Sequence, residues 1–292
     1  MHRLMMGTLA VASATMAVSQ TTPVAKIVQT PPSWSDEFTT GLNANDWDRG
    51  YSPWPNTIAN RFLIGTGERQ IYVDGPYLGK DTLATQAQMN TGGTALFLAR
   101  RMDAATRSRI LTKAAEEQVT AATAAAVGKA DWASAMIKGS AGRASTFRHG
   151  YIEASLQWTP TKESWPAFWL LPKTWGWPPE IDIVEMRIEN GIPMAVMTIH
   201  SKQPGYGARG CRAPIPRNGR GYHRYGFYWN MTTAVFYLDG KVTCRLPAPS
   251  DLNQEFYPIL NLAMGGWGAV PTANTADPQK LQVDYVRVWK GY

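Results

Sequence analysis

The chain has few cysteines and few charged residues, and each shortage excludes a class of protein. Only Cys211 and Cys244 are present among 292 residues, which excludes a disulfide-dense mini-protein and a multi-cysteine zinc site. The two thiols could pair in an oxidising compartment. Charged residues make up 17% and hydrophobic residues 44% of the chain, a composition typical of one ordinary soluble globular domain.

Motifs that define several other enzyme classes are also missing. The sequence contains no H-E-x-x-H zinc motif, no G-x-S-x-G nucleophile elbow and no P-loop. The run 205–210 matches the G-x-G-x-x-G pattern, but it follows Pro204 and opens no helix. We therefore do not expect a dinucleotide-binding loop.

Long hydrophobic runs are absent beyond the N-terminus. Residues 1–19 predict a secretory signal, because His2 and Arg3 precede an apolar run and the small residues Ala17 and Ser19 suit cleavage. No other run is long enough to span a membrane. We expect a secreted or periplasmic monomer comprising residues 20–292, with no membrane association after removal of the signal.

Acidic residues are absent between Asn190 and Leu238, in a chain with a formal net charge of +7. The sequence predicts a Gly/Pro-rich basic loop from Lys202 to Arg224, suited to carboxylate, sulfate, phosphate or pyruvate groups because the arginine fork binds planar anions. Simple surface charge is the alternative. No nucleic-acid-binding module is recognisable, so nucleic acid is not an expected partner. The basic residues are Lys202, Arg209, Arg212, Arg217, Arg220 and Arg224.

Most of the remaining chain consists of short β-type segments separated by turn residues. These segments are rich in β-branched and aromatic residues, and Gly, Pro and Asn lie between them. Many strands without alternating helices favour an antiparallel sandwich. The predicted strands are 70–73, 95–99, 151–158, 167–171 and 181–186.

The clearest hairpin joins residues 234–238 to 241–246. Asp239-Gly240 between them supplies the positive φ angles of a type I′ turn. Alternation predicts that Val242, Cys244 and Leu246 point inward.

One segment departs from the β pattern. Residues 104–127 are rich in alanine, contain no Gly or Pro, and end at Gly128, which predicts a single helix within an insertion at 103–131. We expect it to pack over a sheet edge or at one end of the binding cleft, and a purely tethering role is the alternative. Its predicted apolar stripe is Leu111, Ala115, Val119, Ala122 and Ala126.

Three carboxylates stand in the apolar run from Glu180 to Glu185. In a strand, Glu180 and Asp182 share one face, and Glu185 joins them only if a β-bulge absorbs one extra residue. Crowded like charges push pKa values apart, which is what a nucleophile and a general acid need at one pH. A solvated acidic strand is the alternative.

These carboxylates and their surroundings carry a family resemblance. The chain resembles the bacterial laminarinase and agarase-like branch of glycoside hydrolase family 16. The matching segments are WSDEF (34–38), GYIEA (150–154), WPAFWLLP (165–172), EIDIVE (180–185), TIH (198–200), NLAMGG (261–266) and VDYVRV (283–288).

The resemblance implies an all-β, concanavalin-like β-jelly-roll sandwich whose concave sheet carries a sugar-binding cleft. It also implies that Glu180 is the nucleophile, Asp182 its electrostatic partner and Glu185 the general acid/base. No cofactor is required in such enzymes. A structural calcium ion is implied away from the cleft, with Asp284 as one ligand and backbone carbonyls as most of the others.

Aromatic residues support a sugar substrate. The chain has 12 tryptophans, and Trp165 and Trp169 share one strand face, where flat apolar rings suit pyranose rings. Core packing is the alternative for many of the tryptophans. By the resemblance, His200 lies beside the nucleophile, and Asn60 and Arg61 are candidate sugar contacts.

Together these observations predict a secreted retaining endo-β-glycanase that hydrolyses O-glycosyl bonds of a polysaccharide by double displacement. The substrate would be a β-1,3-glucan or an anionic polysaccharide. A transglycosylase and a non-catalytic carbohydrate-binding sandwich are the alternatives.

Overall fold

The structure is a computed structural model that describes residues 23–40, 42, 45–49, 57–63, 65–73, 87–90, 93–139, 145–174 and 176–291. The predicted signal at 1–19 lies outside these residues. Within the described part of the chain, no helix is both long and apolar enough to cross a membrane.

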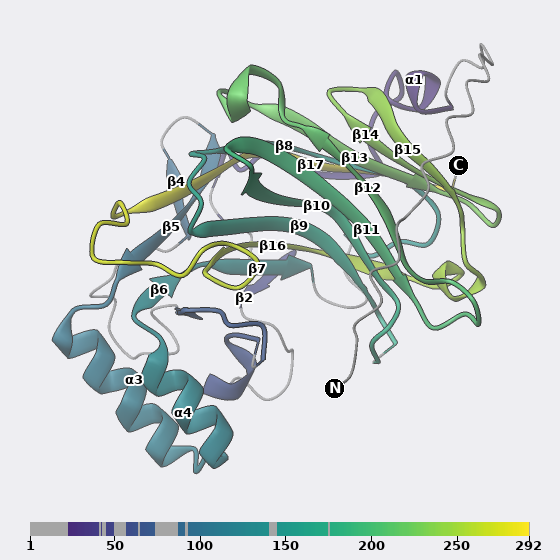
Figure 1. Ribbon diagram of the computed structural model, residues 1–292. Coiled ribbons are helices and arrows are strands. Elements are labelled where there is room, and N and C mark those ends of the chain that lie inside the picture. The colour runs from purple at the N-terminus through teal and green to yellow at the C-terminus, as the bar shows by residue number, and fades with distance from the viewer. Residues whose placement is uncertain are drawn as a thin grey trace, which may run out of the picture.

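Two β-sheets packed face to face form the predicted jelly-roll sandwich (Figure 1). The first sheet runs in the order β15-β14-β13-β8-β17-β5-β6-β3, with β1 beside β17 and β4 beside β5. Its strands are β1 (Trp34–Asp36), β3 (Gln70–Tyr72), β4 (Ala87–Asn90), β5 (Thr94–Arg101), β6 (Trp132–Ser134), β8 (Gly150–Trp158), β13 (His223–Trp229), β14 (Thr233–Leu238), β15 (Lys241–Pro247) and β17 (Gln279–Lys290).

The second sheet runs in the order β12-β11-β10-β9-β16-β7-β2. Its strands are β2 (Trp47–Arg49), β7 (Met136–Gly139), β9 (Ser164–Pro172), β10 (Glu180–Glu189), β11 (Ile192–Ser201), β12 (Gly207–Pro214) and β16 (Phe256–Met264). The helices are α1 (Pro23–Ile27), α3 (Ala104–Glu116), α4 (Ala121–Lys129), and the short 3₁₀ turns η1 (Ile58–Asn60), η2 (Pro216–Gly219) and η3 (Ser250–Leu252). All five strands predicted from their β-branched and aromatic residues are confirmed, each within a few residues of its predicted ends.

The main core fills the space between the two sheets. Alternation along each strand sends one set of side chains inward, and burying such large apolar groups supplies most of the stabilisation of the fold, about 1.5–3 kcal/mol for each. From the second sheet the core receives Ile181, Ile183, Val184, Met197 and Ile199, and from the first sheet Phe227, Trp229, Phe236, Val286 and Val288, among others.

A disulfide bond joins the two sheets at one side of the sandwich. Cys211 on β12 pairs with Cys244 on β15, with their Cα atoms 6.0 Å apart. These two strands are the outermost members of their sheets at that side, and they lie close together in Figure 1. The two cysteines that the sequence allowed to pair therefore do so.

The predicted hairpin is confirmed, with one error in its strand facing. Asp239 and Gly240 have φ angles of 53° and 75°, as a type I′ turn requires. Cys244 and Leu246 pack against the core, but Val242 is exposed. The register shifts between Phe236 and Tyr237, so one extra residue reverses the parity beyond it and turns Val242 outward.

The alanine-rich insertion contains two helices, so the prediction of a single helix was wrong. α3 ends at Glu116, Gln118 takes a φ of 50°, and the side chain of Thr120 caps α4 by accepting from the Thr123 amide. Gly128 does not stop the second helix, which continues to Lys129. The predicted apolar stripe was wrong at Leu111, Ala115 and Ala122, which are exposed, whereas Val119 and Ala126 do pack against a core. The buried residues of the two helices are Thr106, Ile110, Ala114, Thr123 and Val127.

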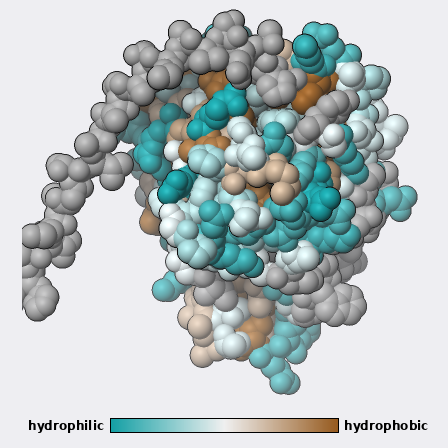
Figure 2. All heavy atoms as spheres, turned by 90° about the vertical axis from the view of Figure 1, so that its right-hand side faces the viewer, coloured by the Kyte–Doolittle hydropathy of each residue, from teal (hydrophilic) through white to brown (hydrophobic). Residues whose placement is uncertain are grey.

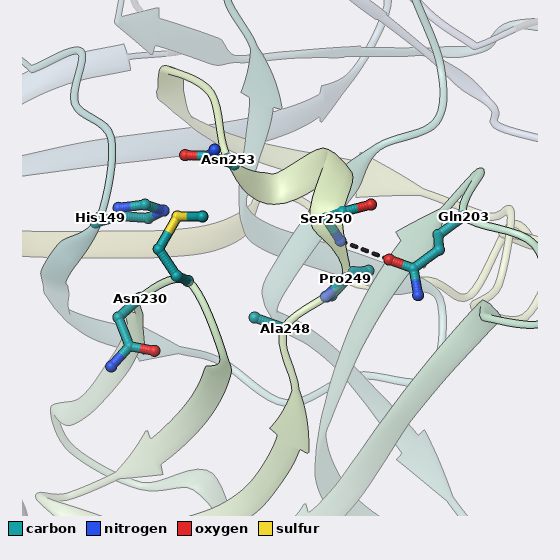
Figure 3. Close-up of a pocket in the computed structure, with 8 residues that line it drawn as sticks. His149, Gln203, Asn230, Ala248, Pro249, Ser250 and Asn253 are labelled. Carbon is teal, nitrogen blue, oxygen red and sulfur yellow. Dashed lines mark hydrogen bonds between the residues drawn. The ribbon is translucent and has the colours of Figure 1, made fainter.

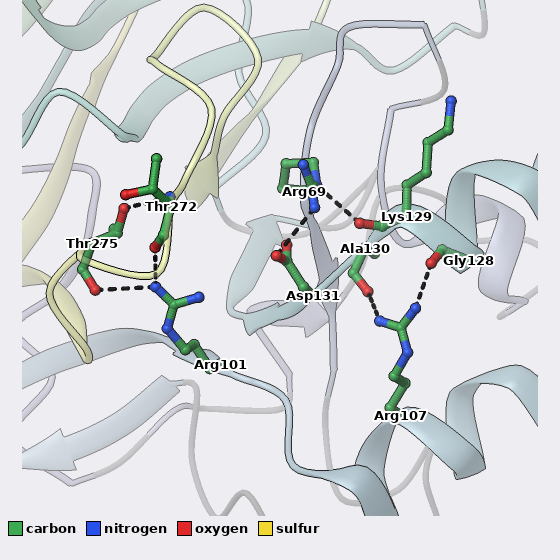
Figure 4. A network of polar contacts seen from close by, with 9 residues as sticks. All are labelled: Arg69, Arg101, Arg107, Gly128, Lys129, Ala130, Asp131, Thr272 and Thr275. Carbon is green, nitrogen blue, oxygen red and sulfur yellow. Dashed lines mark hydrogen bonds and ion pairs between the residues drawn. The ribbon is translucent and has the colours of Figure 1, made fainter.

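The two helices cover the β3–β6 edge of the first sheet, one of the two predicted positions. A second small core there is formed by Ile58, Phe62, Ile71, Val73, Ile110, Ala114, Val127, Ala130 and Ala133. The Arg107 guanidinium donates to the carbonyls of Gly128 and Ala130 at 2.5 and 2.7 Å, and Arg69 binds the Lys129 carbonyl and the Asp131 carboxylate (Figure 4). The insertion is thus attached through both apolar packing and backbone carbonyls.

The basic segment from Lys202 to Arg224 is mostly ordered secondary structure, so its prediction as a loop was wrong. Residues 207–214 form the edge strand β12, which pairs with β11 along its whole length. Gly210 makes the close approach possible, because a Cβ on it would lie 1.9 Å from the Met197 carbonyl oxygen. Adjacent side chains of this strand therefore point to opposite faces of the sheet.

Candidate active site

The carboxylates of β10 lie on one face because the strand contains the predicted bulge. Asp182 pairs with Thr198 and Glu185 with Val196, so three steps along β10 match two steps along β11. Ile183 and Val184 both enter the core, which leaves Glu180, Asp182 and Glu185 on the opposite side of the sheet. We call this side of the second sheet the carboxylate face.

His200 on β11 joins the carboxylates, as predicted. It pairs in register with Glu180, and its Nε2 lies 3.2 Å from Asp182 Oδ2 and 3.9 Å from Glu180 Oε1. One carboxylate oxygen each of Glu180 and Asp182 and one ring nitrogen of His200, atoms that could bind a metal, lie within 4.8 Å of one another. Three such groups could hold a cation, and the same crowding is what catalytic carboxylates require.

Burial and mutual repulsion alter the acidity of these groups. Burial, followed by the Asp182 charge, holds the pKa of Glu180 well above its usual value. Burial and then the Glu185 charge do the same to the pKa of Asp182. Burial also raises the pKa of Glu185, against the Trp165 hydrogen bond and the Arg187 charge. A hydrogen bond from the Glu180 carboxyl group to Asp182 acts in the opposite direction on Asp182, because it favours the ionised form of Asp182.

Trp165 lies against the candidate acid/base. Its indole Nε1 donates to Glu185 Oε1 at 3.0 Å. Gly266, with a φ of 62°, allows the loop after β16 to close over this ring, since a Cβ there would lie 2.5 Å from two Trp165 ring carbons. Trp165 therefore orients Glu185 and presents only a small part of its ring to solvent.

Trp169 lies on the carboxylate face but is covered by neighbouring residues. Its indole Nε1 donates to Asn261 Oδ1 at 2.8 Å, and the Asn261 amide donates to the Tyr72 hydroxyl. Only 7% of Trp169 is exposed. This burial argues against an open sugar platform at Trp169 and indicates a packing role.

Asn60 is the last residue of η1 and Arg61 follows it, beside β3. Asn60 is half-buried and donates to Thr57 Oγ1. Arg61 is only 1% exposed, and its Nη1 donates to the Tyr72 carbonyl at 3.0 Å. A side chain enclosed in this way does not reach a substrate, so we correct the role of Arg61 from sugar contact to support of β3.

Two exposed tryptophans that the sequence reasoning missed flank the carboxylates. Trp177 is 65% exposed, hydrogen-bonds Glu180, and has its ring centroid 5.8 Å from that of His200. Trp267 is 64% exposed and lies in the loop that closes over Trp165. Each follows a glycine in a turn, at 176 and 266, and this pairing of tryptophan with turn residues was the available signal.

Asp284, the residue implied as a calcium ligand, lies in the first sheet and not on the carboxylate face. It stands at a bulge of β17, and its charge helps burial to raise the pKa of Tyr222, which hydrogen-bonds Thr94. Carboxylate oxygens are calcium ligands, so Asp284 stays a candidate ligand.

A separate pocket lies at the end of the sandwich (Figure 3). His149 faces it from one side, and Gln203, whose amide oxygen accepts from the Ser250 amide, lies on the other. Asn230, the first residue of an N-M-T sequence, donates there to the Tyr228 hydroxyl. None of these residues belongs to the carboxylate cluster.

Comparisons with known proteins agree with this geometry. The model of the family "Glycosyl hydrolases family 16" matches residues 104–287. The chain is 30% identical over 263 residues to the endo-1,3-1,4-beta-glycanase EglC of Rhizobium meliloti, and 28% identical over 261 residues to ExsH of the same organism. Each match covers 88% of this chain and 51% of the relative, so the chain spans about half the length of these relatives.

The fold is also that of a known laminarinase. The X-ray structure of the laminarinase from Rhodothermus marinus superposes with a TM-score of 0.65 at 25% identity, covering 89% of this chain and 97% of that one. The family model covers more than half of the chain and includes β10 with its bulge. The chain belongs to glycosyl hydrolases family 16.

Proposed function

We propose that this chain is a secreted, retaining endo-β-glycanase that hydrolyses O-glycosyl bonds within a polysaccharide by double displacement. The observation that carries the proposal is the bulge of β10, which sets Glu180 and Glu185 on one face with Asp182 between them. A strand without the bulge would send Glu185 into the core. The bulge therefore supports a catalytic reading of all three carboxylates.

In the first step, the Glu180 carboxylate attacks the anomeric carbon of the sugar. The Glu185 carboxylic acid protonates the leaving glycosidic oxygen, and a covalent glycosyl-enzyme forms. Burial favours the protonated form of Glu185, which suits this acid role. The Trp165 indole holds the Glu185 side chain in place throughout.

In the second step, Glu185 as the conjugate base takes a proton from water, and the water attacks the anomeric carbon to release Glu180. We assign Asp182 the role of electrostatic partner in both steps, because the hydrogen bond between Asp182 and Glu180 lets the two groups share one proton. His200, 3.2 Å from Asp182, lies where it can exchange or stabilise the proton that the pair shares.

The names of the relatives support a β-glucan as substrate. EglC and ExsH are named endo-1,3-1,4-beta-glycanases, and the neighbouring structure is a laminarinase. The exposed rings of Trp177 and Trp267 offer flat apolar surfaces on both sides of the carboxylates for sugar units.

Stereochemistry tests the proposal directly. The carboxyl groups of a retaining pair lie about 5 to 5.5 Å apart, which leaves no room for a water between the nucleophile and the sugar ring. Proton NMR during hydrolysis of a β-1,3-glucan should therefore show the β anomer as the first product. An α anomer would rule out double displacement, and chain transfer without new reducing ends would favour a transglycosylase.

A further inference from the structure

Two arginines and a glutamate form a group of contacting charged side chains on the carboxylate face. The group begins two residues after Glu185 along β10. Arg187 Nε and Nη2 contact Glu189 Oε1, both at 2.7 Å. Arg212 Nη1, from β12, lies 3.2 Å from Glu189 Oε2. The group has two positive charges and one negative charge, so it remains cationic.

The strand register places this group beside the catalytic carboxylates. Glu185 pairs with Val196 of β11, and Val196 pairs with Arg212 of β12, so these residues form one row across the face. Neighbouring strands are about 4.8 Å apart, which puts the Arg212 backbone roughly 10 Å from that of Glu185. A substituent on a sugar bound at Glu185 lies within reach of a side chain as long as arginine.

An exposed aromatic ring adjoins the same group. The Arg187 guanidinium lies over the Trp267 ring, 5.0 Å from its centroid. This contact fixes one side of a ring that is 64% exposed, and a sugar can stack on it while its substituents face the arginines. Recognition of a sugar unit and of its charge would thus occur at one place.

Glu185 is an acidic neighbour of the group, since the Arg187 charge acts to lower its pKa, but β11 and β12 add no other acid. No Asp or Glu occurs from residue 190 to 238, the segment that contains β11, β12, β13 and β14. The side of the molecule that carries β12 is largely hydrophilic (Figure 2). The Arg212 side chain is 60% exposed, so it is accessible to an anion in solution.

We propose that Arg187, Arg212 and Trp267 form a subsite that binds an acidic substituent, a carboxylate or sulfate, on a sugar unit next to the cleaved bond. Glu189 holds the two guanidinium groups apart and oriented, so that their remaining N–H groups can donate to the anion. The inference rests on the proposed function, because it names the class of polysaccharide that the same site takes.

Arg209 provides a matched control within the same strand. It pairs with Ile199, a core residue, and so belongs to the opposite face from Arg212. Its guanidinium binds the Gly205 and Tyr206 carbonyls and lies over the Tyr206 ring. Replacing Arg209 or Arg212 by Gln removes the same charge from the same strand on different faces.

The test measures binding in the inactive Glu180→Gln background, so that it does not depend on turnover. Affinity electrophoresis would compare a neutral β-1,3-glucan with carboxymethylated and sulfated derivatives of the same backbone. Arg212→Gln should weaken binding of the charged polymers about 5- to 10-fold, the value of one charge-assisted contact, and leave the neutral polymer unchanged. Arg209→Gln should change neither.

For a third variant we predict a change in affinity in the opposite direction. Glu189→Gln removes the only acid of the group and should tighten binding of the charged polymers while Arg212 remains. Equal losses for Arg209→Gln and Arg212→Gln would overturn the subsite and leave a general charge effect. A response to one derivative alone would identify the anion as carboxylate or sulfate. Absence of cleavage by the native chain would refute the proposed function without deciding the binding result.

Discussion

Each sheet contains buried acidic side chains, and the groups that surround these side chains differ between the two sheets. In the first sheet, Glu153 on β8 accepts hydrogen bonds from the Tyr151 and Tyr285 hydroxyls, each at 2.7 Å, and the Arg287 guanidinium lies over the Tyr285 ring. In the second sheet, Glu180 and Asp182 face each other, Glu185 and a histidine. Glu153 has a phenol donor for each oxygen, whereas the β10 carboxylates crowd one another and accept from the Trp165 and Trp177 indoles.

The difference shows why burial alone does not indicate catalysis. A buried carboxylate with two phenol donors is satisfied and contributes to a fixed structure. Several carboxylates buried together have raised pKa values, which helps one of them to stay protonated as a general acid. We therefore expect substitutions of the β10 carboxylates to reduce turnover and substitution of Glu153 to reduce stability.

The largest expected effect is on turnover at β10. Glu180→Gln and Glu185→Gln should each lower kcat on a β-glucan by at least about 10³-fold, because each removes a group that acts in a chemical step. Asp182→Asn should retain more activity, since Asp182 does not bond to the sugar. Glu153→Gln is the control and should keep kcat within a few-fold. Reducing-end assays, with circular dichroism to verify folding, would decide; an active Glu180→Gln variant would contradict the assignment.

A buried carboxylate outside both of these groups makes the stability of the protein depend on pH. Glu68 accepts from the Leu63 amide and the Gln70 side chain, and burial raises its pKa to about 7. The unfolded chain ionises near 4.5, so the stabilising contribution of protonated Glu68 is full below that pH and is lost as the pH rises through about 7.

The loss amounts to roughly 3 kcal/mol above pH 7, from a shift of about 2.5 pKa units. Glu68→Gln should therefore gain stability relative to the native chain as the pH rises from 4 to 8. Urea unfolding at both pH values measures the difference. A stability difference that does not change with pH would mean that Glu68 is ionised in the folded protein.

A smaller effect is expected on stability at Glu153. Glu153→Gln replaces one acceptor oxygen by an NH₂ group, so one of the two tyrosine hydroxyls loses its partner. The free energy of unfolding should fall by about 1–3 kcal/mol. Urea unfolding of this variant beside Glu180→Gln should show the larger loss for Glu153→Gln, and the reverse order would remove the distinction between the two places.

The smallest effect concerns Asp284, a single carboxylate at a bulge of the first sheet. If it holds calcium, EDTA should lower the Tm of the native chain by a few degrees, about 1 kcal/mol in a domain of this size. Asp284→Asn should start from the lower Tm and not respond to EDTA. Identical responses of both proteins would place any calcium elsewhere.

Much of the fold and the carboxylate cluster could be predicted because local rules determine them. Strand alternation identified the main strands, and the odd spacing from Asp182 to Glu185 required the bulge that the structure has. The break between α3 and α4 was missed, because Gln118 takes its positive φ without a Gly or Pro to mark it.

Residue roles that depend on three-dimensional neighbours were harder to predict. Trp169 packs against Tyr72, and Arg61 is enclosed by neighbouring residues. Strand parity reveals neither of these environments. The Gly and Pro residues of the basic segment are typical of loops and therefore predict a loop. In the structure, Gly210 instead allows β12 to approach β11 closely.

The disulfide between β12 and β15 has a consequence for how the protein responds to its redox surroundings. β12 pairs with β11 on one side, and on its other side it is an outermost strand fixed to the opposite sheet by Cys211. β10, by contrast, lies between two paired strands. Under reducing conditions β12 should loosen before β10 does, and Arg212 would move with it. Discrimination between charged and neutral polymers would then be lost under milder reducing conditions than the cleavage activity.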